Sequence, residues 1–200
     1  ESLLTILSRL SVAQALYFTT PNKIWNLRGG VINKVIFRNG NTSKTIAPWS
    51  KEEFSLIPDI KDSLFNLKND GFKLFVVTNQ PDIAKGIIDN SFVVEMNEMI
   101  LKYLPIDEIR FCPHSNMDEC DCRKPKPGMI LDLADKWNIE CQNSFLIGDS
   151  CKDIEAGKKV GVTTFLLKRH YNKGANADHK VTDLSEAVKI IQNIHRHRQA

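Results

Sequence analysis

The first quarter of this 200-residue chain has almost no acidic side chains. After Glu1 the next acidic residue is Glu52, whereas the stretch between them contains seven Lys or Arg residues. Residues 1–51 therefore carry a formal charge of +6, and residues 52–200 a charge of −3. Between residues 2 and 51 this absence excludes a nucleophilic carboxylate, a carboxylate acid or base, and a carboxylate ligand for a hard cation such as Mg²⁺.

Other absences bound the class of protein. No apolar run approaches the roughly 18 residues that suggest a membrane span, so we expect no transmembrane segment. The basic residues are scattered rather than clustered, which argues against binding to nucleic acid. The hydrophobic content of 42% and charged content of 26% are typical of a soluble globular protein, and 200 residues suffice for one substantial core.

The sequence predicts an N-terminal helical extension at residues 1–22, separate from a main domain at residues 23–200. Apolar side chains recur there at helical spacing: Leu3, Ile6, Leu7, Leu10 and Ala13. The basic, acid-poor composition is typical of organellar targeting segments, but it also suits a solvated face or a surface that docks onto a protein partner. The chain starts at Glu rather than Met, so we expect a processed protein or a fragment.

Helical and strand patterns alternate along the rest of the chain. Helical patterns cover residues 59–69, 91–104, 129–137 and 184–194, with a further helix through Ala156. Buried strand patterns cover residues 73–77, 108–112, 144–147 and 163–167. The alternation predicts an α/β, Rossmann-like fold, in which helices cover both faces of a parallel sheet and ligands bind at the carboxyl ends of the strands.

Two segments near the start of the main domain are candidates for the first core strand. Either residues 15–18 or residues 23–27 could form the first core strand. Asn39-Gly40 is a strong hairpin signal, and it predicts a short flap between residues 31–37 and 42–46.

Three cysteines and one histidine fall within eleven residues: Cys112, His114, Cys120 and Cys122. Zinc takes such ligands tetrahedrally, and closed four-ligand sites of this kind are structural rather than catalytic. The sequence therefore predicts a structural zinc loop. Cys141 and Cys151 remain as free thiols, which favours a reducing compartment such as the cytoplasm or an organelle matrix, the mitochondrial matrix included.

Polar side chains suited to phosphate follow the predicted strands. A hydroxyl, an amide and two cations that could bind phosphate oxygens are supplied by Thr78, Asn79, Arg123 and Lys124. Asp149 and Asp153 form a carboxylate pair that could hold Mg²⁺. Each signal is weak alone, because a Thr or Asp after a strand is often only a helix cap. Their order on alternating strands makes chance a poor explanation.

These segments resemble the haloacid dehalogenase superfamily, most closely its zinc-containing branch with the D-glycero-D-manno-heptose 1,7-bisphosphate phosphatases and histidinol phosphatases. Residues 76–86 are similar to the second motif of the family, residues 112–125 to its zinc loop and third-motif lysine, and residues 145–153 to its fourth motif. The resemblance implies that Thr78, Asn79, Arg123 and Lys124 grip phosphate or sugar. It also implies that Asp149 ligates Mg²⁺ with the support of Asp153.

The first motif of that family is missing. It is a strand followed by Asp-x-Asp-Gly, in which the first Asp attacks phosphorus and the second is the general acid-base. The best match places Leu27 and Gly29 at the two Asp positions, and the alternative strand would place Thr19 and Pro21 there. Since no register supplies an acid, the match also predicts a weak magnesium site.

The leading hypothesis is a catalytically degenerate phosphatase, a pseudoenzyme kept as a structural subunit or as a module that binds a phosphorylated ligand. The competing hypothesis is a working Mg²⁺-dependent sugar phosphatase of the heptose bisphosphate type, with a displaced nucleophile. Asp82 and Asp121 are the nearby candidates for that nucleophile, and both are expected in solvated loops.

Overall fold

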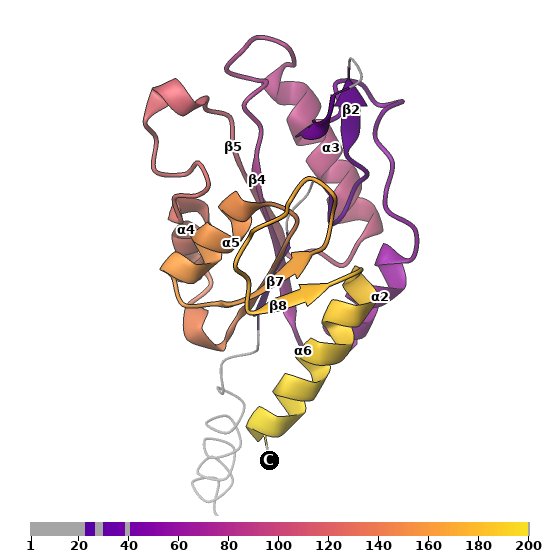
Figure 1. Cartoon of the computed structure of the whole chain (residues 1–200), viewed down its shortest axis with the longest axis vertical. Helices are drawn as coiled ribbons and strands as arrows, with labels where there is room; N and C mark the ends of the chain where they lie inside the picture. The colour runs from indigo at the N-terminus through magenta and orange to yellow at the C-terminus, as the bar shows by residue number, and fades with distance from the viewer. Residues whose placement is uncertain (1–22, 27–29, 39–40, 200) are drawn as a thin grey trace, which may run out of the picture.

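The core of the molecule is a six-stranded parallel sheet. The computed structural model of the chain describes residues 23–26, 30–38 and 41–199 (Figure 1). The strand order is β5-β4-β1-β6-β7-β8. The strands are β1 (Lys23–Asn26), β4 (Lys73–Asn79), β5 (Glu108–Cys112), β6 (Phe145–Gly148), β7 (Thr163–Leu167) and β8 (His179–Val181). Every neighbouring pair is parallel, which confirms the predicted α/β architecture.

Five helices of the described part of the chain form the outer layers. They are α2 (Ile60–Asn69), α3 (Asn90–Tyr103), α4 (Gly128–Lys136), α5 (Cys151–Lys159) and α6 (Leu184–Gln199). Figure 1 shows α4 and α5 on one side of the sheet and α2, α3 and α6 on the other. Two short 3-10 turns, η1 (Asn116–Asp118) and η2 (Cys141–Asn143), lie in the connections. No helix in the described part of the chain is both long and apolar enough to span a membrane.

Burial on both faces explains the composition of the central strands. In β4, the run from Leu74 to Val77 is fully buried, so it shows continuous apolar residues rather than alternation. Phe72, Phe145 and Phe165 are also buried, and the ring of Phe145 packs against both of the others. The core therefore fixes the strands, and with them the edge at which their carboxyl ends meet.

The structure decides between the two candidates for the first strand. β1 lies at the centre of the sheet, where Asn26 pairs with Val76 of β4 and with Ile147 of β6. The alternative strand and the predicted extension at residues 1–22 lie outside the described residues, and so do Leu27 and Gly29. The extension and its docking role stay predictions.

A two-stranded antiparallel hairpin follows β1, as Asn39-Gly40 predicted. It consists of β2 (Ile36–Arg38) and β3 (Asn41–Ile46). The first strand of the hairpin, β2, is shorter than expected, because residues 30–33 turn inward and bury Val31 and Ile32. β8 was not predicted, since three residues are too few to show a pattern.

Candidate functional site

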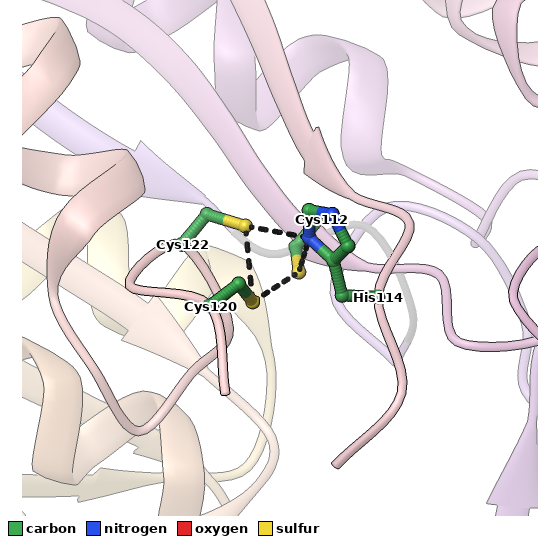
Figure 2. Close-up of side chains that lie close together, drawn as sticks. All are labelled: Cys112, His114, Cys120 and Cys122. Atoms are coloured by element: carbon green, nitrogen blue, oxygen red, sulfur yellow. Dashed lines mark hydrogen bonds between the residues drawn. The ribbon is translucent and has the colours of Figure 1, made fainter. Parts of the chain in front are cut away.

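The four predicted zinc ligands are gathered at the carboxyl end of β5. Their ligand atoms all lie within 4.8 Å of one another (Figure 2). Cys112 Sγ is 3.6 Å from both His114 Nδ1 and Cys120 Sγ, and Cys122 Sγ is 3.4 Å from Cys120 Sγ and 3.3 Å from His114 Nδ1. In a tetrahedron with Zn–S bonds of about 2.3 Å, the ligand atoms lie about 3.5–3.8 Å apart. The cluster therefore has the size and the donors to hold a metal ion such as zinc.

Burial and the crowding of the thiols affect their protonation. Burial is the largest cause, and together with the neighbouring sulfurs of Cys112 and Cys120 it raises the pKa of Cys122 far above its ordinary value. A bound dication reverses this effect, because a coordinating thiol is deprotonated. Cys141 and Cys151, predicted to be free thiols, form no disulfide.

Arg123 braces the loop between these ligands. Its Nη1 donates to the carbonyl oxygen of His114 at 3.0 Å, and its Nε donates to Asn116 Oδ1 at 2.7 Å. These N–H groups of Arg123 therefore hold the loop in place, and phosphate binding by Arg123 stays a prediction.

Lys124 links this loop to the end of β4. Its backbone N–H donates to Asn79 Oδ1 and its carbonyl accepts from Asn79 Nδ2, both at 3.1 Å. Its side chain is only 6% exposed, and Nζ donates to the carbonyl of Val77 at 2.8 Å and lies 3.1 Å from Asp153 Oδ1. Three elements thus meet at one ammonium group.

Thr78 completes this group of polar side chains. It is buried next to Asn79, and its hydroxyl oxygen accepts from Gln80 Nε2 at 3.1 Å. The hydroxyl keeps its own proton for donation, which a phosphate oxygen could accept. The fold therefore brings Asn79 and Lys124 into contact at the carboxyl edge, next to Thr78, and phosphate binding by these residues stays a prediction.

Asp149 directly follows β6 and is only 7% exposed. Tyr171 donates its hydroxyl to Asp149 Oδ2 at 2.6 Å, and Asn172 Nδ2 donates to the Asp149 carbonyl at 2.8 Å. Burial, followed by repulsion from Asp153, raises the pKa of Asp149 to about 7, although Tyr171, Lys124 and Arg169 lower it. In the reverse direction, burial and Asp149 raise the pKa of Tyr171.

Gly30 lies directly against this carboxylate. Its φ is +75°, and a Cβ added there would stand 2.0 Å from Asp149 Oδ2. Glycine is therefore required, both for the backbone conformation and for the close approach. Only residues 27–29 separate Gly30 from the end of β1. Because they lie outside the described residues, the match that places Leu27 and Gly29 at the missing Asp positions stays a prediction.

The described residues do not fit a magnesium ion in this arrangement. Mg²⁺ requires near-octahedral oxygen ligands. However, Asp149 Oδ2 already accepts a hydrogen bond from Tyr171 and lies directly against Gly30. Asp153 Oδ1 faces Lys124, and its Oδ2 accepts from the backbone and hydroxyl of Ser150 at 2.9 and 2.6 Å. Among the described residues, the only gathered group of three or more His, Cys, Asp or Glu ligands is the Cys/His cluster.

Neither candidate for a displaced nucleophile is poised for attack. Asp82 was expected in a solvated loop, but it is buried, and Trp49 Nε1 and Lys85 Nζ donate to its two oxygens at 3.0 and 2.7 Å. Asp121 is solvated as expected, with 97% of its side chain exposed and Lys126 at 3.3 Å.

Three residues of the site were missed from the sequence: Arg169, Tyr171 and Asn172. They lie in the loop between β7 and β8, which carries no recognised motif. A signal was available, because this loop leaves the carboxyl end of β7, at the same edge of the sheet as Asp149.

A family model described as haloacid dehalogenase-like hydrolase matches residues 30–167. The chain belongs to this family. Two relatives are D-glycero-beta-D-manno-heptose-1,7-bisphosphate 7-phosphatases. The protein from Rhodopseudomonas palustris is 37% identical over 58% of this chain and 71% of the relative. The protein from Photorhabdus laumondii is 31% identical over 70% and 86%.

Solved structures show the same haloacid dehalogenase-like fold. The D,D-heptose 1,7-bisphosphate phosphatase from B. bronchiseptica, complexed with magnesium and phosphate, aligns with a TM-score of 0.73. It is 22% identical, and the alignment covers 86% of this chain and 99% of that one. The two relatives confirm the resemblance seen in the motifs, to the heptose bisphosphate branch of the family.

Proposed function

We propose that this haloacid dehalogenase-like chain binds a phosphorylated small molecule of the sugar phosphate class and does not hydrolyse it through an aspartyl phosphate. The ligand would lie at the carboxyl ends of β4 and β6, against Thr78, Asn79 and Lys124. Its phosphate would accept hydrogen bonds there and meet the positive charge of Lys124.

One observation carries the proposal: residues 2–51, which include the central strand β1, contain no carboxylate. A covalent phosphatase needs a nucleophile, a general acid and a metal ligand at this position, and a leucine and a glycine supply none of them. Removing a catalytic nucleophile costs several orders of magnitude in rate in other covalent enzymes.

The second candidate function is a working Mg²⁺-dependent sugar phosphatase, and the names of the relatives favour it. This function would need a carboxylate from outside the first 51 residues. Asp82 would have to leave both Trp49 and Lys85 to attack phosphorus, which opposes the role.

A paired assay on the zinc-loaded full chain separates the two functions. We expect no Mg²⁺-dependent turnover of heptose 1,7-bisphosphate, histidinol phosphate or an aryl phosphate. We also expect thermal stabilisation by a sugar bisphosphate, weakened by Lys124→Ala but not by Lys126→Ala. Turnover that Asp149→Ala abolishes would refute the proposal and establish the phosphatase. If neither turnover nor stabilisation occurs, the result favours the structural subunit instead.

A further inference from the structure

We propose that the loop between β7 and β8 takes the place of the family's divalent cation, with Tyr171 closing Asp149 to metal. The site would then bind its ligand without a divalent cation. The ligand itself rests on the proposed function, but the exclusion of the cation is tested separately.

The hairpin of β2 and β3 packs against Tyr171 where Tyr171 contacts Asp149. The Tyr171 hydroxyl donates to Asp149 Oδ2 at 2.6 Å, which is the short range of a hydrogen bond to a carboxylate. The Tyr171 ring packs edge-on against His170 and against Phe37 of β2, with centroids 5.2 and 6.1 Å away. The phenol is therefore held over the carboxylate by two further rings.

The backbone of the same loop is built around Asp149. Asn172 is buried, and its Nδ2 donates both to the Asp149 carbonyl at 2.8 Å and to the Leu167 carbonyl at 2.7 Å. Its Oδ1 accepts from the backbone N–H of Arg169 at 3.0 Å. Since Asn172 neighbours Tyr171, this network fixes the phenol with respect to the acid.

Arg169 adds positive charge beside Asp149. Its Nη1 donates to the carbonyl of Thr182 at 3.0 Å, and its Nη2 to the carbonyl of Gly30 at 3.4 Å. Gly30 faces the same oxygen that accepts from Tyr171. A metal ion that binds Asp149 Oδ2 would have to displace the phenol, and it would find no carboxylate partner in residues 2–51.

The test measures Mn²⁺, a paramagnetic substitute for Mg²⁺, on the zinc-loaded full chain by electron paramagnetic resonance. We expect no specific Mn²⁺ binding to the wild type at millimolar concentration. Tyr171→Phe should raise Mn²⁺ affinity about tenfold or more, because it removes one hydrogen bond to a charged group. Phe37→Ala, at an exposed ring, should raise it less. Tyr103→Phe, at an exposed tyrosine of α3, is the matched control and should change nothing.

Two outcomes would overturn the proposal. One is submillimolar Mn²⁺ binding by the wild type that Asp149→Asn removes. The other is a folded Tyr171→Phe variant and a Phe37→Ala variant that both bind Mn²⁺ no better than the wild type. Binding of inorganic phosphate, measured with and without Mg²⁺, is the separate arm. Its complete absence would refute the proposed function and leave the Mn²⁺ result intact, whereas phosphate binding that requires Mg²⁺ would overturn the exclusion of the cation.

Discussion

Replacing Asp149 with Asn should stabilise the protein, and increasingly so as the pH rises. The folded pKa of Asp149 is raised to about 7 from 3.8, first by burial and then by Asp153. A group with a raised folded pKa contributes stability that is fully present below the unfolded pKa and is lost as the pH rises through the folded pKa. The amide introduced by Asp149→Asn would not ionise, and it would keep an oxygen that accepts from Tyr171.

The magnitude follows from the two pKa values. The difference between 3.8 and about 7 corresponds to about 4 kcal/mol of unfolding free energy once Asp149 is fully ionised, near pH 8.5. At pH 5 little more than a third of this loss has accumulated. The advantage of Asp149→Asn should therefore grow by about 3 kcal/mol between pH 5 and pH 8.5.

Urea unfolding of the zinc-loaded chain across this pH range, without Mg²⁺, measures the effect. Asp107→Asn is the control of opposite sign. Burial raises the pKa of Asp107, but hydrogen bonds from Lys68, the Leu74 N–H and Lys73 outweigh it and leave the pKa lowered. The stability that Asp107 contributes is present above its unfolded pKa and is lost as the pH falls, so its variant should be destabilised at neutral pH.

A constant difference between wild type and Asp149→Asn at all pH values would refute this reasoning, as would a variant less stable than the wild type at pH 8.5. If millimolar Mg²⁺ stabilises the wild type alone and removes the difference, the ionised carboxylate has a cation after all. That result would also contradict the proposed role of Tyr171.

Three further substitutions test the surroundings of the site by urea unfolding and metal analysis. Gly30→Ala should lower the free energy of unfolding by about 2–4 kcal/mol, since its Cβ would stand 2.0 Å from a buried carboxylate. Gly71→Ala, at φ +83° with nothing within 4 Å, should lower it by only about 1 kcal/mol. Equal losses for the two variants would contradict the close approach. Lys124→Met should lower the free energy of unfolding by about 3–5 kcal/mol, because it removes the ion-pair partner of buried Asp153. Exposed Lys126→Met should lower it by less than about 0.5 kcal/mol. An equally small loss for Lys124→Met would mean that the ion pair is not formed. Wild type should contain about one zinc per chain, and Cys122→Ser should lose both zinc and stability; a wild type without zinc would end that prediction.

The sequence predicted those parts of the fold that depend on local pattern and short spacing. The buried run in β4 and the alternation of strands and helices identified a parallel sheet, because both faces of such a sheet are covered. The four ligands from Cys112 to Cys122 were found because zinc loops are local in sequence. β8 was missed for the opposite reason, since three residues carry no period.

Contacts between distant loops could not be predicted. Tyr171 reaches Asp149 across 22 residues, and Trp49 reaches Asp82 across 33 residues. Both pairs depend on where a flap or a strand-end loop lies once the sheet has formed. The same limit explains why Asp82, placed by composition in a solvated loop, is buried instead.

The loss of the first-motif acids and the contact made by Tyr171 are linked by the physics of a buried carboxylate. Asp149 follows β6 at the edge of the sheet, where its carboxyl group is buried and loses hydration unless a cation or hydrogen-bond donors compensate. A chain that keeps Asp-x-Asp can share a cation among several carboxylates. This chain has no acid in residues 2–51 to share one, so the buried Asp149 is compensated by a phenol donor and by nearby Lys124 and Arg169. The absence of acids at the front of the sequence therefore accounts for the closing of the site around Asp149.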